Sequence, residues 1–124
     1  MINKFEKLRA WKYAIELASL TYSATKKFPK SEAFILSSQM VRAATSISAN
    51  VAEGCSRSSA KDKNHFLEIA IGSAFELKSH IEVAFGQNYI EQKEKNKIDL
   101  FNEETIKLIY GLKRSINVPK IPAK

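Results

Sequence analysis

The chain has 124 residues, of which 44% are hydrophobic and 27% charged, a composition typical of a globular protein. Its 20 lysine and arginine residues outnumber 13 aspartate and glutamate residues, which gives a formal net charge of +7. No apolar run approaches the roughly 20 residues of a membrane-spanning helix, and the N-terminal sequence lacks the apolar block of a secretory signal. We therefore expect a cytoplasmic protein without a membrane partner, with one domain over residues 1–116 and a flexible tail over residues 117–124.

Sparse glycines and prolines divide the chain into four predicted helices, near residues 3–27, 32–54, 59–86 and 92–117. Ser31 is expected to cap the second helix, and Ser59, followed three residues later by Asp62, resembles a capping box for the third. Gly54 is expected to close the second helix. The pattern predicts an all-α fold, namely an antiparallel up-down four-helix bundle.

The first two predicted helices carry more apolar surface than one bundle can hide. The first has two adjacent apolar arcs, one of Phe5, Leu8, Trp11, Ile15, Ala18 and Tyr22, the other of Ala10, Tyr13, Ala14, Leu17, Leu20 and Ala24. The second has one apolar face of Leu36, Met40, Ala43, Ala44, Ile47 and Val51, and a roughly opposite set of Phe34, Val41, Ala49 and Ala52. A bundle covers only part of each helix, so we predict that further copies of the chain cover the rest, in a ring-shaped homo-oligomer.

The fourth predicted helix is an ordinary bundle helix. Its apolar residues fall on one narrow arc, made of Ile98, Phe101, Thr105, Leu108, Ile109, Leu112 and Ile116. Charged residues occupy the remaining surface, so this helix is expected to bury a single face.

Polar residues also recur at helical spacing, and we predict that they form a structural polar seam between the second and third helices. Its members are Gln39, Arg42, Asn50, Glu53 and Glu76. Because these helices should run in opposite directions across a short turn, Arg42 and Glu76 lie at similar height, and we expect them to pair.

Catalytic and metal-binding patterns are missing from the sequence. Two histidines and one cysteine, Cys55, do not have the spacing of a zinc site, and the Glu-x-x-His motifs of di-iron bundles are not present. No phosphate-binding glycine loop or nucleophile motif occurs either. The sequence thus predicts a protein that is not an enzyme and has no cofactor and no metal.

Basic residues are the candidate binding site. They are Lys4, Lys7, Arg9, Lys12, Lys26, Lys27, Lys30, Arg57, Lys61 and Lys63. The clusters at 26–30 and 57–63 flank the first and second turns, so they should lie at opposite ends of the bundle, and a ring would repeat each one. Repetition turns a weak phosphate contact into a strong one, although a merely solubilising basic surface has the same composition.

Three segments carry a resemblance to a known family: FEKLRAWKYAIEL, FPKSEAFILSSQMVRAATSISANVAEGCSRSS and FLEIAIGSAFEL. In this order and spacing they resemble the four-helix-bundle proteins encoded in intervening sequences of bacterial 23S ribosomal RNA genes. A related branch is the accessory variability protein of diversity-generating retroelements. The family often has proline where this chain has Ser48. The resemblance implies an antiparallel bundle that forms a homopentameric ring, no known catalysis, and association with nucleic acid and a reverse transcriptase.

Two functional hypotheses follow from the sequence. The first is a non-enzymatic ring that binds RNA or DNA backbone through repeated basic clusters. The second is a protein-interaction scaffold that recruits a nucleic-acid-processing partner.

Overall fold

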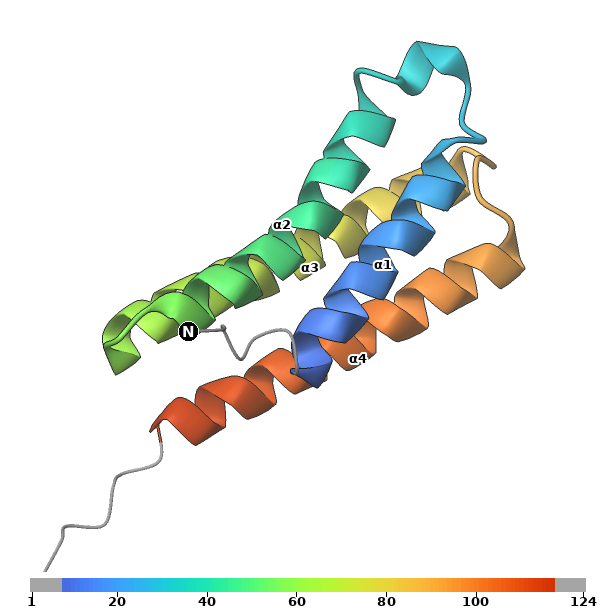
Figure 1. Cartoon of the computed structure of the whole chain (residues 1–124). Helices are drawn as coiled ribbons and strands as arrows, with labels where there is room; N and C mark the ends of the chain where they lie inside the picture. The colour runs from blue at the N-terminus through green and yellow to red at the C-terminus, as the bar shows by residue number, and fades with distance from the viewer. Residues whose placement is uncertain (1–7, 118–124) are drawn as a thin grey trace, which may run out of the picture.

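The computed structural model describes residues 8–117, which form four α-helices (Figure 1). The helices are α1 (Arg9–Thr25), α2 (Leu36–Ser56), α3 (Ala60–Gly86) and α4 (Gln92–Asn117), and a short 3-10 helix, η2 (Lys30–Glu32), lies between α1 and α2. No strand occurs within the described range. The prediction of an all-α chain with four helices is confirmed.

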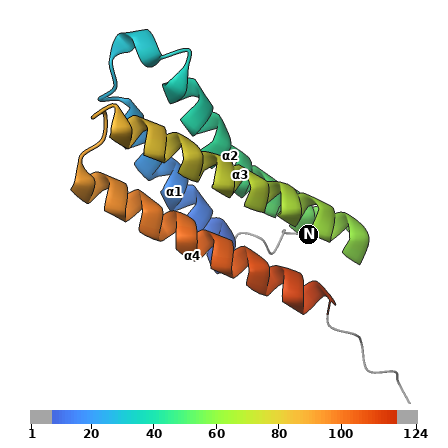
Figure 2. The ribbon, with the colours of Figure 1, turned by 180° about the vertical axis from the view of Figure 1, so that it is seen from behind.

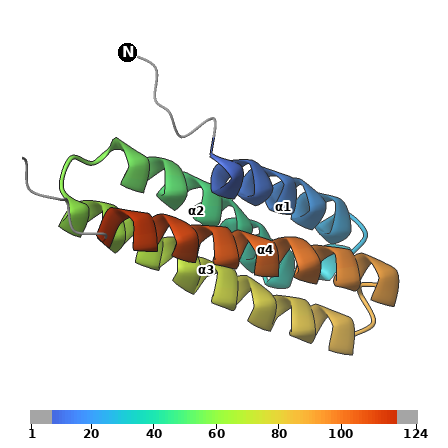
Figure 3. The same cartoon turned by 90° about the horizontal axis from the view of Figure 1, so that it is seen from below.

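The helices pack around one core, and each contacts two neighbours. α2 packs against α1 and α3, and α4 also packs against α1 and α3. The most extensive contact is between α2 and α3. The start of α1, the end of α2, the start of α3 and the end of α4 lie towards the same end of the molecule (Figures 1 and 3). Seen from behind, α3 and α4 lie side by side in front of α1 (Figure 2). Segments far apart in the sequence therefore meet at each end.

α1 begins later than predicted. Leu8 has an extended backbone, with φ −75° and ψ 133°, so the helix starts at Arg9. The earlier part of the predicted helix, including Phe5, lies outside the described residues. As a result, α1 is the shortest of the four α-helices.

α2 begins at Leu36, four residues later than predicted, and Ser31 does not cap it. Glu32 holds this turn instead. Its carboxylate accepts hydrogen bonds from the backbone N–H of Leu36 at 3.4 Å and from the hydroxyl of Tyr89 at 3.0 Å. A contact with the turn between α3 and α4 therefore fixes the chain before α2.

The junction between α2 and α3 depends on Gly54. α2 continues past this residue to Ser56, so Gly54 does not end the helix as predicted. Gly54 is buried, and a Cβ atom there would lie 3.2 Å from the carbonyl oxygen of Lys63 and 3.4 Å from Cβ of Phe66. The missing side chain lets the two helices approach closely. Ser59 then caps α3 as predicted, because its Oγ accepts the N–H of Asp62 at 3.1 Å.

Alanine and aliphatic side chains build most of the core. The predicted inner face of α2 is buried, as are Ala10, Ala14, Leu17 and Ala24 from one of the two predicted arcs of the first helix. α3 and α4 add further aliphatic residues, among them Leu67, Ala70, Leu77, Ile81, Ile98 and Ile109. Asn102 is also buried, and its Nδ2 donates to the carbonyl oxygen of Ala74 at 3.0 Å, which joins α4 to α3.

Candidate nucleic-acid interface

Positive charge gathers in the half of the molecule that contains the start of α1, the end of α2, the start of α3 and the end of α4. We call this half the basic half, and its residues are Arg9, Lys12, Arg57, Lys61, Lys63, Lys107, Lys113 and Arg114. The first five belong to the predicted set, and the last three are additions from α4. Lys4 and Lys7 of the predicted set lie outside the described residues.

Some of these cations already have partners. The guanidinium of Arg57 pairs with Glu53 and lies over the Phe66 ring, 4.9 Å from its centroid. The ammonium of Lys63 donates to the carbonyl oxygen of Cys55 at 3.4 Å. These contacts hold the cations close to the junction between α2 and α3.

Other cations of the basic half are available to a ligand. Lys113 lies 3.7 Å from the carboxylate of Glu68, and Lys107 lies 3.6 Å from that of Glu104, both exposed or half-exposed pairs. Such pairs are weak in water. Four further cations of the basic half form no ion pair with a carboxylate of the described residues: Arg9, Lys12, Lys61 and Arg114.

The opposite half also carries cations, some with a carboxylate partner and some without one. Of the predicted cluster Lys26, Lys27 and Lys30, all three are exposed, and Lys27 pairs with Glu94 at 3.3 Å. The predicted basic set is thus divided between the two ends of the molecule.

A charge network between α3 and α4 neutralises further cations in that half. The ammonium of Lys95 contacts Asp99 at 2.8 Å and Glu82 at 2.9 Å, and Lys78 contacts the same two carboxylates at 3.1 and 2.6 Å. Hydrogen bonds to Asp99 and Glu82 raise the pKa of Lys95, and hydrogen bonds from Lys78 and Lys95 lower the pKa of Glu82. The network joins two helices and neutralises Lys78 and Lys95, whereas Lys26, Lys30, Lys93 and Lys97 form no ion pair with a described carboxylate.

A hollow of about 490 Å³ lies between the start of α1 and the end of α4. Three cations line it, namely Arg9, Lys107 and Arg114, together with apolar groups of Leu8, Ala10, Leu108, Gly111 and Leu112. No carboxylate is among the described residues that line it. We call this feature the α1/α4 hollow.

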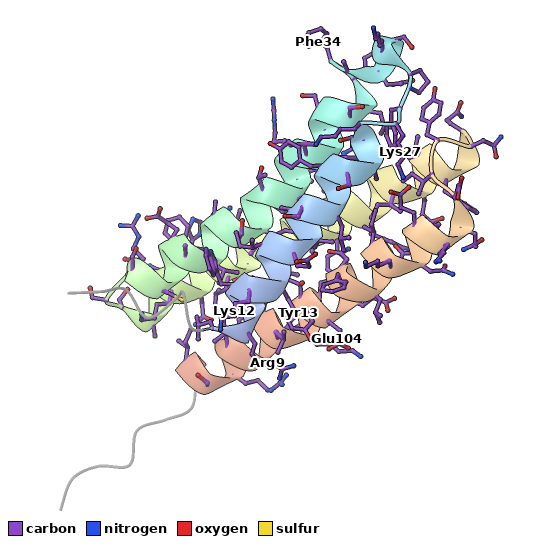
Figure 4. All side chains as sticks on the ribbon, turned by 45° about the vertical axis from the view of Figure 1, so that its right-hand side comes forward. Arg9, Lys12, Tyr13, Lys27, Phe34 and Glu104 are labelled. Atoms are coloured by element: carbon purple, nitrogen blue, oxygen red, sulfur yellow. The ribbon has the colours of Figure 1, made fainter. Side chains whose placement is uncertain are left out.

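Aromatic packing and a glycine position the two arginines of the α1/α4 hollow. Arg9 lies against the Tyr13 ring, 5.7 Å from its centroid, and Tyr13 packs on Phe101 of α4 (Figure 4). A Cβ atom on Gly111 would lie 3.7 Å from Nη2 of Arg114, so this guanidinium folds back over the bare glycine. Sequence reasoning missed Lys107 and Arg114 because only the fold brings them next to Arg9.

Short polar side chains lie where α2 packs on α3. Asn50 donates from Nδ2 to the carbonyl oxygen and Oγ of Ser46 at 2.8 and 3.0 Å, and the hydroxyl of Ser73 on α3 bonds Ser46 Oγ at 2.9 Å. The hydroxyl groups of Ser46 and Ser73 therefore bridge α2 and α3, whereas Asn50 bonds to a residue of its own helix.

The predicted pairing of Arg42 with Glu76 is not formed within the chain. Glu76 instead contacts His80 one turn along α3 at 3.2 Å, and Glu53 pairs with Arg57 in the same way at the end of α2. Arg42 and Gln39 remain exposed. Both acidic members of the predicted seam therefore bind neighbours in sequence, at spacings where side chains of one helix meet without any tertiary contact.

The described residues contain no cluster of three histidine, cysteine, aspartate or glutamate side chains that could hold a metal ion. Cys55 is half-buried at an apolar pocket of about 310 Å³, and burial raises the pKa of its thiol. A raised pKa keeps the sulfur protonated near neutral pH, where a thiol is a weak nucleophile.

Large apolar side chains remain outside the core, among them Ile15 and Tyr22 from the predicted arcs of the first helix. Phe34 is 96% exposed in the turn before α2, where it extends away from the helices (Figure 4), and Ile35 follows it. On α3, Phe75 is 57% exposed. Gly72, between Ile69 and Phe75, has no atom within 4 Å of the place where a Cβ would lie.

None of the helices in the described part of the chain is long and apolar enough to cross a bilayer.

Comparisons with known proteins identify relatives of this fold and sequence. No curated protein matches the chain. Among solved structures, it is similar to a protein of unknown function from the S23 ribosomal protein family of Bacteroides thetaiotaomicron, with 25% identity and a TM-score of 0.78 over 85% of this chain and 98% of that one. Residues 6–111 match the family described as 23S rRNA-intervening sequence protein. The chain therefore belongs to the 23S rRNA-intervening sequence protein family.

Proposed function

We propose that the chain is a non-enzymatic protein that assembles from identical copies and binds RNA or DNA through backbone phosphates. The observation that carries this proposal is the basic half, in which Arg9, Lys12, Lys61 and Arg114 have no carboxylate partner among the described residues. Unpaired exposed cations attract phosphates and release their counterions, a sequence-independent source of affinity.

The charge distribution favours binding over simple solubilisation. A solubilising surface intersperses both signs, whereas the α1/α4 hollow gathers three cations and no carboxylate among the described residues that line it. The basic half around this hollow collects cations from three different helices and the turn after α2. The names of the matched family and of the Bacteroides relative also connect such proteins with ribosomal RNA genes and ribosomes.

Assembly supports the same function. Exposed Phe34, Ile35, Phe75 and Val83 form apolar surface that a lone chain leaves in water, and an open glycine at position 72 allows another backbone to approach. We propose a closed ring of antiparallel bundles, with five copies as the family resemblance implies. A ring repeats the basic half around one rim, so that several weak phosphate contacts act together.

A protein-interaction scaffold is the second candidate. It is favoured by Phe34, whose ring is 96% exposed at the end opposite the basic half, where a partner could contact it without competing for phosphates. An accessory role beside a nucleic-acid-processing enzyme, as in the retroelement branch, would fit such a division. Capture of one defined partner that survives nuclease treatment, and is lost in Phe34→Ser, supports this function.

Fluorescence anisotropy of a labelled oligonucleotide tests the main proposal. At about 50 mM salt and micromolar protein, we expect binding of both RNA and DNA, because phosphate contacts are strong at low salt. A double variant, Lys12→Gln with Lys61→Gln, should weaken binding of all sequences to a similar degree. Absence of binding by the wild-type protein under these conditions would contradict the proposal.

A further inference from the structure

We propose that the α1/α4 hollow holds one unpaired nucleotide of a single-stranded nucleic acid. This assignment rests on the proposed function and narrows its ligand from nucleic acid in general to strands with accessible bases. It is carried by three features of the hollow: the cations on its wall, its apolar surface and its size.

The cations supply the phosphate contact. Arg9 and Arg114 present guanidinium groups, whose planar donors bind two phosphate oxygens at once, and Lys107 adds an ammonium. Arg114 is already folded over Gly111, towards the hollow, so little side-chain freedom is lost on binding. The exposed pair between Lys107 and Glu104 at 3.6 Å is weak enough for a phosphate to replace it.

The apolar groups supply the second contact. Ala10 is buried, and the half-buried side chains of Leu8, Leu108 and Leu112 line the hollow beside the cations. A lysine or arginine patch that bound only phosphates would not need such groups. A sugar and the face of a base can cover them once the phosphate is held at the charged wall.

The size of the hollow separates single strands from duplexes. Its volume of about 490 Å³ lies within the roughly 300–1,000 Å³ of small-molecule sites, enough for a nucleotide. Bases in a duplex stay stacked and paired, so a duplex can offer its phosphates but not a base face. We therefore expect the hollow to favour single strands.

Filling the hollow without changing charge is the most specific test. Gly111→Leu places a side chain where the Cβ would already lie 3.7 Å from Arg114, whereas Gly86→Leu adds the same side chain to α3 in open space and is the matched control. For a labelled oligouridine, Gly111→Leu should lower affinity about tenfold, the loss expected for one nucleotide contact, and Gly86→Leu should leave it unchanged. Affinity for a duplex of equal length should change less than about twofold.

Charge variants give an independent test if Gly111→Leu does not fold by circular dichroism. Arg114→Gln should weaken single-strand binding and make the log–log salt slope less negative by about 0.7, the value for one phosphate of a single strand. Lys61→Gln, in the basic half but outside the hollow, should weaken single strand and duplex alike. Arg114→Gln should reduce single-strand affinity more than duplex affinity.

Each failure has a distinct meaning. Unchanged oligouridine binding by a folded Gly111→Leu overturns the hollow as a site, while the proposed function survives through other cations. Equal losses for single strand and duplex overturn the unpaired nucleotide. If the wild-type protein binds neither nucleic acid, the proposed function fails, and the assignment of the hollow fails with it.

Discussion

Gly72→Leu tests whether another copy covers the outer face of α3. In the single chain, nothing lies within 4 Å of the position that a Cβ would occupy, so the new side chain has room. Glycine in a helix interior is less favourable than leucine by about 0.8 kcal/mol, so a lone chain should gain that much in free energy of unfolding. This gain corresponds to an increase in melting temperature of about 3 °C for a chain of this length.

In an assembly that covers Gly72, the same side chain meets the neighbouring copy. Overpacking a close contact costs about 1–3 kcal/mol, which lowers an association constant by roughly five- to 150-fold. Light scattering over a concentration series should therefore show a lower mass for Gly72→Leu than for wild type. Glu103→Leu, at an exposed position of α4, is the control and should keep the wild-type mass.

Two results would refute this reasoning. If Gly72→Leu retains the wild-type mass at every concentration while the protein becomes more stable, no copy lies over Gly72. If the variant loses its helical circular dichroism, the space around Gly72 is not open as the single chain shows.

Three further predictions concern the fold. Ala43 is only 2% exposed, so Ala43→Glu should unfold the chain, because burying a charge costs several kcal/mol. Ala49→Glu, on the exposed side of α2, should keep the helical circular dichroism and reduce the mass of the assembly in light scattering. Unfolding of both variants would contradict this prediction. Gly54→Val should lower the urea midpoint by the equivalent of about 1–3 kcal/mol, and an unchanged midpoint would refute the close approach of α2 and α3. The pKa of Glu82 lies below its usual 4.5 in the folded chain, so its contribution to stability is present above about pH 4.5 and is lost as the pH falls through the folded-state pKa. Urea titrations at several pH values should therefore show that acid lowers the free energy of unfolding less in Glu82→Gln than in the wild type.

The helices and the core could be predicted because both depend on local periodicity. The inner face of α2 and the cap at Ser59 follow from residues close in sequence, and the structure has both. The start of α2 could not be predicted in the same way. It is fixed by the bond between Glu32 and Tyr89, which are 57 residues apart, and no local pattern reveals such a contact.

The candidate site was predicted less completely than the fold. Arg9 could be selected from the sequence as part of a basic N-terminal segment. Lys107 could not, because it lies close to acidic residues in the sequence and belongs to no basic cluster there. Only the packing of α1 on α4 places these side chains around one hollow. The predicted pairing of Arg42 with Glu76 failed for a related reason: equal height allows two groups to meet, but Glu76 has His80 one turn away on its own helix.

The salt dependence of nucleic-acid affinity tests the central claim most directly. Binding of the wild-type protein to a labelled single-stranded oligonucleotide, measured from about 50 to 200 mM salt, should fall linearly on a log–log plot by about 0.7 per neutralised phosphate. Contacts with the four unpaired cations of the basic half alone predict a slope near −3 for one copy, and a steeper slope for an assembly that engages several copies. An affinity that does not change with salt concentration, or no binding at the lowest salt concentration, would contradict the account.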